Sequence, residues 1–134
     1  MKDDIPFDEG EYLVERSFLM NPELSAIELD RTIIRVFRDQ QGRRRMNGRC
    51  FVQNILMVEL LEVGDDLDLV LDFGGEFKYL LKNPELKAGK VFSPDVKSVL
   101  QFSPRIPWEQ IPQSEFENLL LQLKIISGQK TAGT

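Results

Sequence analysis

Arginine is the residue type whose number and spacing most clearly suggest chemistry in this sequence. From Arg31 to Arg49, nineteen residues include seven arginines, and the acidic residues beside them are Asp30 and Asp39. A planar guanidinium donates paired hydrogen bonds to phosphate or carboxylate groups. If residues 31–49 form a hairpin, alternate arginines project from one face and the turn presents the rest. We therefore expect a surface for an anion or an acidic partner, formed by Arg38, Arg43, Arg44, Arg45 and Arg49.

The alternative for this arginine-rich hairpin is structural. Its arginines would then be solvated, or would pair with the protein's own carboxylates across neighbouring strands. A phosphate-cradling glycine loop, a dinucleotide-binding fingerprint and a helix-turn-helix pattern are all absent from the sequence.

A second group of chemically relevant residues is acidic. Residues 59–76 contain no lysine or arginine, and Asp66, Asp68 and Asp72 would share one face of a strand. Oxygen ligands in that arrangement suit a divalent cation, so a metal-dependent hydrolase using these three aspartates is the enzymatic alternative. Their spacing is not that of an EF-hand loop, and carboxylates on the wet face of a strand are common. We therefore expect no metal and no cofactor.

Apolar residues near the C-terminus indicate a third surface. Trp108 lies in a segment with three prolines, residues 103–112, and tryptophan is enriched at binding hot spots. Leu121 and Ile125 lie four residues apart, off the core stripe of a predicted helix, and widen its apolar face. We expect Trp108, Leu121 and Ile125 to form an apolar surface for a protein partner or a second copy. The alternative is that Trp108 packs over the core and the helix is largely buried.

Other catalytic groups are scarce. The chain has no histidine and one cysteine, which removes the serine and cysteine triads, the histidine metal sites and the usual general base near neutral pH. Cys50 lies in an apolar run, so we expect a packed thiol, although a flanking arginine could lower its pKa. The protein is therefore predicted not to be an enzyme.

Composition limits the remaining classes. The chain has 134 residues, 42% of them hydrophobic, and a formal net charge of -5. That charge argues against a protein whose whole surface binds nucleic acid, but it allows a local basic patch. No apolar run is long enough to cross a membrane, and the acidic N-terminus lacks the features of a secretory signal. We expect a cytoplasmic protein with a flexible acidic arm over residues 1–10, one domain over 11–128 and a flexible tail over 129–134.

The elements that would hold the arginines are predicted as follows. A first strand lies within residues 12–19, and Asn21-Pro22 is a helix-start signal for a short helix to about Leu29. β-Branched residues favour a strand over 31–37, closed by a turn at 39–42; a single helix over 22–40 is the alternative. Residues 49–63 are so uniformly apolar that their periodicity does not distinguish a helix from a strand.

The second half of the chain is predicted to hold one further strand and several helices. Alternation of Leu67, Leu69, Leu71 and Phe73 with mainly acidic residues predicts a strand with one buried and one wet face. Residues 76–82 and 94–102 are predicted as short helices. The final helix has Ser114 as its cap, Glu117 in a capping box, Lys124 in its last turn and Gly128 after it.

Together these elements predict an α+β fold. An antiparallel sheet or small partly open barrel is centred on residues 31–73, with flanking helices, and the C-terminal helix packs on it through Phe116, Leu120 and Leu123. The expected function is that of a non-catalytic protein-protein binding module: an adaptor, a chaperone-like factor, an inhibitor or a small assembly subunit. Its partner is another protein or a second copy. Nucleic-acid or nucleotide binding through residues 31–49 is the alternative.

Overall fold

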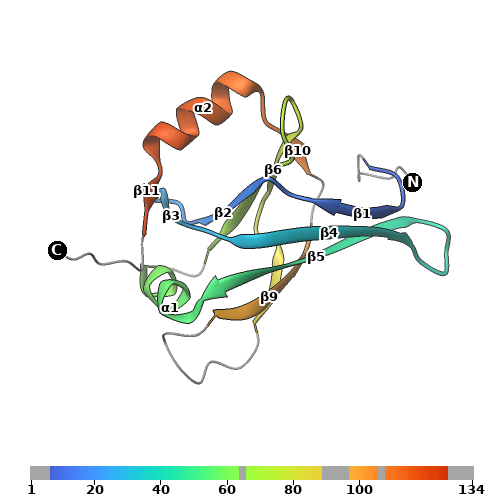
Figure 1. Cartoon of the computed structure of the whole chain (residues 1–134), viewed down its shortest axis with the longest axis horizontal. Helices are drawn as coiled ribbons and strands as arrows, with labels where there is room; N and C mark the ends of the chain where they lie inside the picture. Colours follow the sequence, from blue (N-terminus) through green and yellow to red (C-terminus); the bar gives the residue numbers. More distant parts are fainter. Residues whose placement is uncertain (1–6, 64–65, 89–96, 106–107, 127–134) are drawn as a thin grey trace.

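In the part of the chain that the structure describes, two β-sheets and two helices form an α+β fold (Figure 1). The computed structural model describes residues 7–63, 66–88, 97–105 and 108–126. Sheet A has the strand order β1-β4-β5-β9-β8 and sheet B the order β10-β7-β6-β2-β3-β11. All described pairings are antiparallel except that of β11 with β3.

Sheet A consists of β1 (Gly10–Leu13), β4 (Asp30–Arg38), β5 (Arg44–Gln53), β8 (Glu85–Ala88) and β9 (Lys97–Ser103). Sheet B consists of β2 (Arg16–Met20), β3 (Ser25–Glu28), β6 (Asp68–Asp72), β7 (Lys78–Leu81), β10 (Glu109–Gln110) and β11 (Lys124–Ile125).

The β4–β5 hairpin is the longest pairing in sheet A. Its turn is held by Asp39, whose Oδ1 accepts hydrogen bonds from the backbone N–H groups of Gln41 at 2.9 Å and Arg43 at 3.0 Å. Gly42 has φ +78°, a left-handed conformation that glycine adopts without steric cost. The predicted strand over 31–37 and the turn after it are thus confirmed, and the alternative helix over 22–40 is wrong.

The two sheets join where the chain changes direction sharply. Only Val14 and Glu15 separate β1 in sheet A from β2 in sheet B, and only Leu29 separates β3 from β4. At these corners Glu15 N–H donates to Asp72 O at 2.8 Å, and Leu29 N–H donates to Ser17 O at 2.9 Å. The sheets therefore pack face to face without closing into a barrel.

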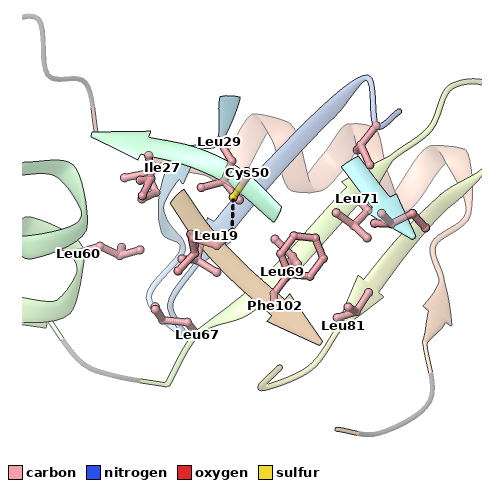
Figure 2. Packing of buried hydrophobic residues seen from close by; sticks show 14 of the residues in the cluster. Leu19, Ile27, Leu29, Cys50, Leu60, Leu67, Leu69, Leu71, Leu81 and Phe102 are labelled. Carbon is pink, nitrogen blue, oxygen red and sulfur yellow. Dashed lines mark hydrogen bonds between the residues drawn. The ribbon is translucent and has the colours of Figure 1, made fainter. Parts of the chain in front are cut away.

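The main hydrophobic core lies between the sheets (Figure 2). Sheet B contributes residues such as Leu19 and Leu69, and sheet A contributes Cys50, Leu100 and Phe102, all 2% exposed or less. Helix α1 (Asn54–Val63) closes one end of this core with Leu56 and Leu60. The predicted packed thiol is confirmed, since Cys50 is buried and unpaired with any other cysteine.

A second core holds the C-terminal helix on the opposite side of sheet B. Helix α2 (Gln113–Gln122) contributes Phe116, which is 3% exposed and packs with Phe18, Met20 and Val70 of the sheet. Leu119 and Leu120 are half-buried beside it, and Leu123 directly follows the helix. The order of layers is therefore α2, sheet B, sheet A (Figure 1). No helix in the described part of the chain is long and apolar enough to span a membrane.

The helix predicted from Asn21-Pro22 to Leu29 is wrong. Residues 21–24 form a turn: Leu24 N–H donates to Asn21 O at 3.0 Å, and Ser25 N–H donates to Asn21 Oδ1 at 2.9 Å. The turn leads into β3, because Ser25–Glu28 pair with β2. An asparagine before a proline suits a turn as well as a helix cap, and here it makes a turn.

Two further predicted helices are strands. Within residues 76–82, Lys78–Leu81 form β7 between β6 and β10. The described part of the segment 94–102 belongs to β9, which pairs with β5 and β8. The segment left open, 49–63, is divided between β5 and α1. In all three segments the secondary structure depends on which strands pair in the sheet. The hydrophobic pattern of a single segment does not show which strands it pairs with.

The signals assigned to the ends of the final helix are also wrong, although the helix itself is present. Its N-cap is Pro112, with no side-chain cap, and Gln113 Nε2 donates to Glu117 Oε2 at 2.8 Å. The helix ends at Gln122, so Lys124 belongs to β11, while Gly128 lies outside the described residues. In β6 both faces are covered: Val70 and Asp72 are buried like Leu69 and Leu71, because α2 packs over the face predicted to be wet.

Candidate functional site

The outer face of sheet A, which points away from the core, carries rows of solvent-facing side chains. Strand register places Leu13, Ile33, Arg49, Gln101 and Lys87 side by side in one row across all five strands. The rows on either side hold Glu11, Arg35 and Asn47 toward the hairpin turn, and Phe51 and Val99 toward α1. The row nearest the turn holds Phe37 and Arg45.

This face is basic in an acidic protein. Among the side chains of this face that the structure describes are five basic residues and three acidic ones, Glu11, Asp30 and Glu85, in a chain of net charge -5. Arg31, Arg35 and Arg49 form no ion pair with any carboxylate of the described residues. Within the described structure, no carboxylate therefore neutralises their positive charge. The basic residues of the face are Arg31, Arg35, Arg45, Arg49 and Lys87.

A shallow pocket of about 150 Å³ opens at the centre of the face. Two arginines and two amides, Arg35, Arg49, Asn47 and Gln101, line it together with Ile33 and the backbone of Gly48. Enclosed sites for whole small molecules measure roughly 300–1,000 Å³. This pocket can hold only one planar or anionic group of a larger ligand.

Gly48 forms part of the pocket for a reason that lies in the core. A Cβ at this position would overlap the ring of Phe102, which packs against the backbone from the inner side. Phe102 is itself 2% exposed and pairs with Gly48 in the register of β5 and β9. The aromatic ring thus takes the space of a side chain at Gly48 and supports the sheet beneath the pocket.

Two aromatic rings lie at the ends of the basic region, each beside an arginine. The Arg35 guanidinium lies 5.5 Å from the centroid of the Phe37 ring, and that of Arg31 lies 5.7 Å from the Phe51 ring. Arg31 has φ +51° and stands at a β-bulge between Asp30 and Ile33. Bulges redirect side chains and are frequent beside functional sites.

The arginines near the hairpin turn differ from Arg31, Arg35 and Arg49 in having partners within the protein. Arg38 Nε donates to Glu9 Oε2 at 2.8 Å, and Arg45 Nε donates to Asp39 Oδ2 at 2.7 Å. Arg44 Nη1 donates to the backbone oxygen of Phe7 at 2.7 Å and lies 3.7 Å from Asp8 Oδ1. For Arg38, Arg44 and Arg45, pairing with the protein's own acceptors is thus observed.

Of the five arginines predicted as a site, two remain without a carboxylate partner. Arg49 lines the pocket, and Arg43 is exposed at the turn, where its guanidinium forms no ion pair with a carboxylate of the described residues. The hydrogen bond from Arg45, followed by that from the Arg43 backbone, lowers the pKa of Asp39. Asp39 is therefore ionised at neutral pH and ties the turn together.

The three aspartates considered for a metal do not converge. Asp72 is buried and pairs with Lys78 Nζ at 3.2 Å, and Asp68 Oδ1 accepts the backbone N–H of Asn83 at 2.9 Å. Asp66 is exposed. Among the residues that the structure describes, no three His, Cys, Asp or Glu side chains are grouped as metal ligands.

The predicted apolar surface is divided. Trp108 is half-buried, with its ring centroid 5.7 Å from that of Phe7 and 5.4 Å from that of Tyr79, so it packs over the core instead of standing as an exposed anchor. Leu121 on α2 and Ile125 on β11 are 85% and 47% exposed. Both were predicted to lie on the final helix, but Ile125 lies in the strand after it, so the two side chains do not share a helix face.

Cys50 offers no reactive thiol. Burial raises its pKa to about 12, and its Sγ faces the backbone oxygen of Leu100 at 3.7 Å (Figure 2). A thiol that stays protonated near neutral pH is a poor nucleophile. The flanking arginine considered for lowering its pKa, Arg49, points to the opposite face of the sheet.

Sequence reasoning missed part of this surface. Phe37, Phe51, Asn47 and Gln101 were not predicted as site residues, and Arg35 was recognised only as part of the arginine cluster. The alternation of β4 and β5 contained a signal for the first three, since they share the parity of the arginines. Gln101 had no such signal, because its segment was predicted as a helix.

Comparisons place no known protein beside this chain. No protein-family model matches it, and searches of curated proteins and of solved structures give no significant match.

Proposed function

We propose that the protein is a non-catalytic binding module that takes a nucleic acid or nucleotide on the outer face of sheet A. The observation that carries this proposal is a set of arginines that form no ion pair with any described carboxylate, on a sheet face that no described element covers. The other large sheet face is covered by α2. Arginine is well suited to phosphate because its fork donates two parallel hydrogen bonds.

Packing supports the assignment to this face. An antiparallel sheet commonly has one solvated face, and that face normally carries polar residues of mixed sign. Here cations predominate, while apolar side chains such as Leu13, 78% exposed, and Val99, 38% exposed, remain in contact with water. Exposed apolar surface bordered by positive charge suits a ligand that is itself part apolar and part anionic.

Electrostatics gives the proposal a numerical test. Binding of single strands weakens with salt in proportion to the number of phosphates neutralised. Among the described side chains of the face, four cations form no ion pair with a described carboxylate: Arg31, Arg35, Arg49 and Lys87. If each meets one phosphate, affinity should fall about 50-fold between roughly 50 and 200 mM salt. Removing two of them should reduce that factor to about 7-fold.

The experiment is a fluorescence anisotropy titration of a labelled mixed-sequence oligonucleotide with the wild type and with Arg35→Gln/Arg49→Gln. The double variant should bind more weakly at low salt and show the shallower salt dependence. The matched control is Arg16→Gln/Lys124→Gln, which removes the same charge from exposed positions of sheet B. Equal affinity of both double variants would refute the proposal, as would no binding by the wild type at 50 mM salt.

A second candidate function is self-association through the α2–β11 surface. The exposed Leu121 and Ile125 favour it, since they adjoin β11, the edge strand of sheet B. Light scattering at low and high salt should then detect a dimer in the wild type and a monomer in Leu121→Glu/Ile125→Glu. A wild type that stays monomeric at high concentration and in both salt conditions would dispose of this candidate.

A further inference from the structure

We infer that the ligand of this face is a single-stranded nucleic acid whose bases stack on Phe37 and Phe51 and whose intervening nucleotide enters the central pocket. This inference rests on the proposed function and names the class of nucleic acid and its mode of contact. It is carried by the placement of two aromatic rings at opposite ends of the basic face, with amides between them.

The breadth of the face argues against a duplex. Neighbouring strands are about 4.8 Å apart, so five strands span roughly 19 Å. The major groove of B-form DNA is about 12 Å wide and admits a helix or a two-stranded ribbon. The row from Leu13 to Lys87 crosses all five strands, and a surface of that width can contact an unpaired strand along its length but cannot enter a groove.

The spacing of the rings suits several nucleotides in sequence. Phe37 pairs with Arg45, and Phe51 lies six residues farther along the same strand β5. At about 3.4 Å per residue the two rings are therefore roughly 20 Å apart along the strand. Sheet proteins that bind single strands stack successive bases on aromatic rings at sites of about four or more nucleotides.

The groups between the rings supply the remaining contacts. Arg35 and Arg49 carry charge for two phosphates, and Asn47 and Gln101 each offer both a donor and an acceptor to a base edge. In a duplex those edges are already paired, whereas in a single strand they are free. The guanidinium groups of Arg31 and Arg35 already lie over the rings of Phe51 and Phe37, and they can extend the stack because guanidinium planes stack on bases.

The first test compares three probes at one salt concentration: single-stranded RNA, single-stranded DNA and a DNA duplex of the same sequence. We expect either single strand to bind at least 10-fold more tightly than the duplex. Equal or tighter binding of the duplex would overturn the inference while leaving the proposed function intact. Absence of binding to all three would overturn both.

The second test removes the rings without removing charge. Phe37→Leu and Phe51→Leu keep an apolar side chain, and each should weaken single-strand binding about five-fold or more. The matched control is Phe77→Leu, an exposed ring before β7 in sheet B, which should bind like the wild type. Unchanged affinity in both variants would contradict base stacking, even if the arginine variants lose binding.

A measurement on the wild type keeps the inference falsifiable if a ring variant fails to fold. Ring protons of Phe37 and Phe51 should shift upfield in NMR spectra when a single-stranded oligonucleotide is added, because a stacked base shields them. Inorganic polyphosphate, which has charge and no bases, should not produce that shift. Unmoved ring signals at saturating oligonucleotide would refute stacking.

Discussion

The outer faces of the two sheets differ in what covers them. Sheet B turns Phe18, Met20, Ala26 and Val70 outward, and Phe116 of α2 covers them. Sheet A turns arginines, amides and two half-buried rings outward, and its face stays open in the described structure. One sheet face has thus become a second core and the other a surface. The difference teaches that polarity at alternate positions decides which face is covered by a helix and which stays open in the described structure.

The strongest test of this difference is to truncate one ring on each face. Phe116→Ala removes a side chain that is 3% exposed and should lower the free energy of unfolding by about 3–5 kcal/mol. Phe51→Ala removes a half-buried ring from the open face and should cost far less. Urea denaturation measures the free energy of unfolding of both variants. Equal losses would mean that Phe51 contributes to stability as a core residue does.

The next largest effect concerns the glycine beneath the pocket. Gly48→Ala forces a methyl group into the space of the Phe102 ring, and overpacking a core costs about 1–3 kcal/mol. A matched change is Gly75→Ala, where no atom lies close to the added Cβ but φ is +57°, so only backbone strain acts. Thermal melting of the two variants compares overpacking with strain. A Gly48→Ala protein as stable as wild type would show that Phe102 is free to move.

Smaller effects are expected from the arginines of the open face. Arg35→Gln and Arg49→Gln should each change the free energy of unfolding by no more than about 0.5 kcal/mol, because exposed side chains without buried partners contribute little to stability. The same variants should lose ligand affinity. A large loss of stability in either would mean that the arginines hold the sheet together, and the binding data would then need reinterpretation.

The smallest effect should come from acid. The pKa of Asp39 is lowered in the folded protein, chiefly by its hydrogen bond with Arg45. A depressed pKa stabilises the fold above the ordinary value of 3.8 and loses that contribution as pH falls through the lower, folded value. Hydrogen exchange should show the 39–43 turn loosening below about pH 4, while β6 stays protected. Asp39→Asn should remove this pH dependence.

Much of the sheet A hairpin was predictable, because its information is local. β-Branched residues in β4, alternating charge and a turn ending in Gly42 lie within twenty residues of one another. The pairing of Arg38 with Glu9 was not predictable in the same way, since it depends on β1 aligning with β4 across an intervening excursion through sheet B. The structure was therefore needed to tell which arginines pair with the protein's own carboxylates and which do not pair with any described carboxylate.

Sheet B was predicted poorly for a physical reason. Asn21-Pro22 can cap a helix or make a turn, and only the pairing of Ser25–Glu28 with β2 decides between them. Likewise Asp72 appeared to be a solvent-facing carboxylate, but its buried partner Lys78 lies on the next strand. Partners in sheet B and beneath α2 come from distant segments, and composition alone does not identify them.

The pairing of β5 with β9 also has a consequence for how the protein is made. Cys50 and Leu100 are directly paired although they are 50 residues apart, and most of sheet B is formed by residues between or before them. Pairings between distant segments form slowly, because the entropy of closing a long loop is lost before the contacts that stabilise the pairing are made. On the ribosome, sheet A cannot be completed until β8 and β9 have been synthesised, so a nascent chain can form the β4–β5 hairpin well before the whole outer face of sheet A exists. In a variant that folds slowly, the part of the face that forms last, around Gln101 and Lys87, should therefore be lost before the hairpin is.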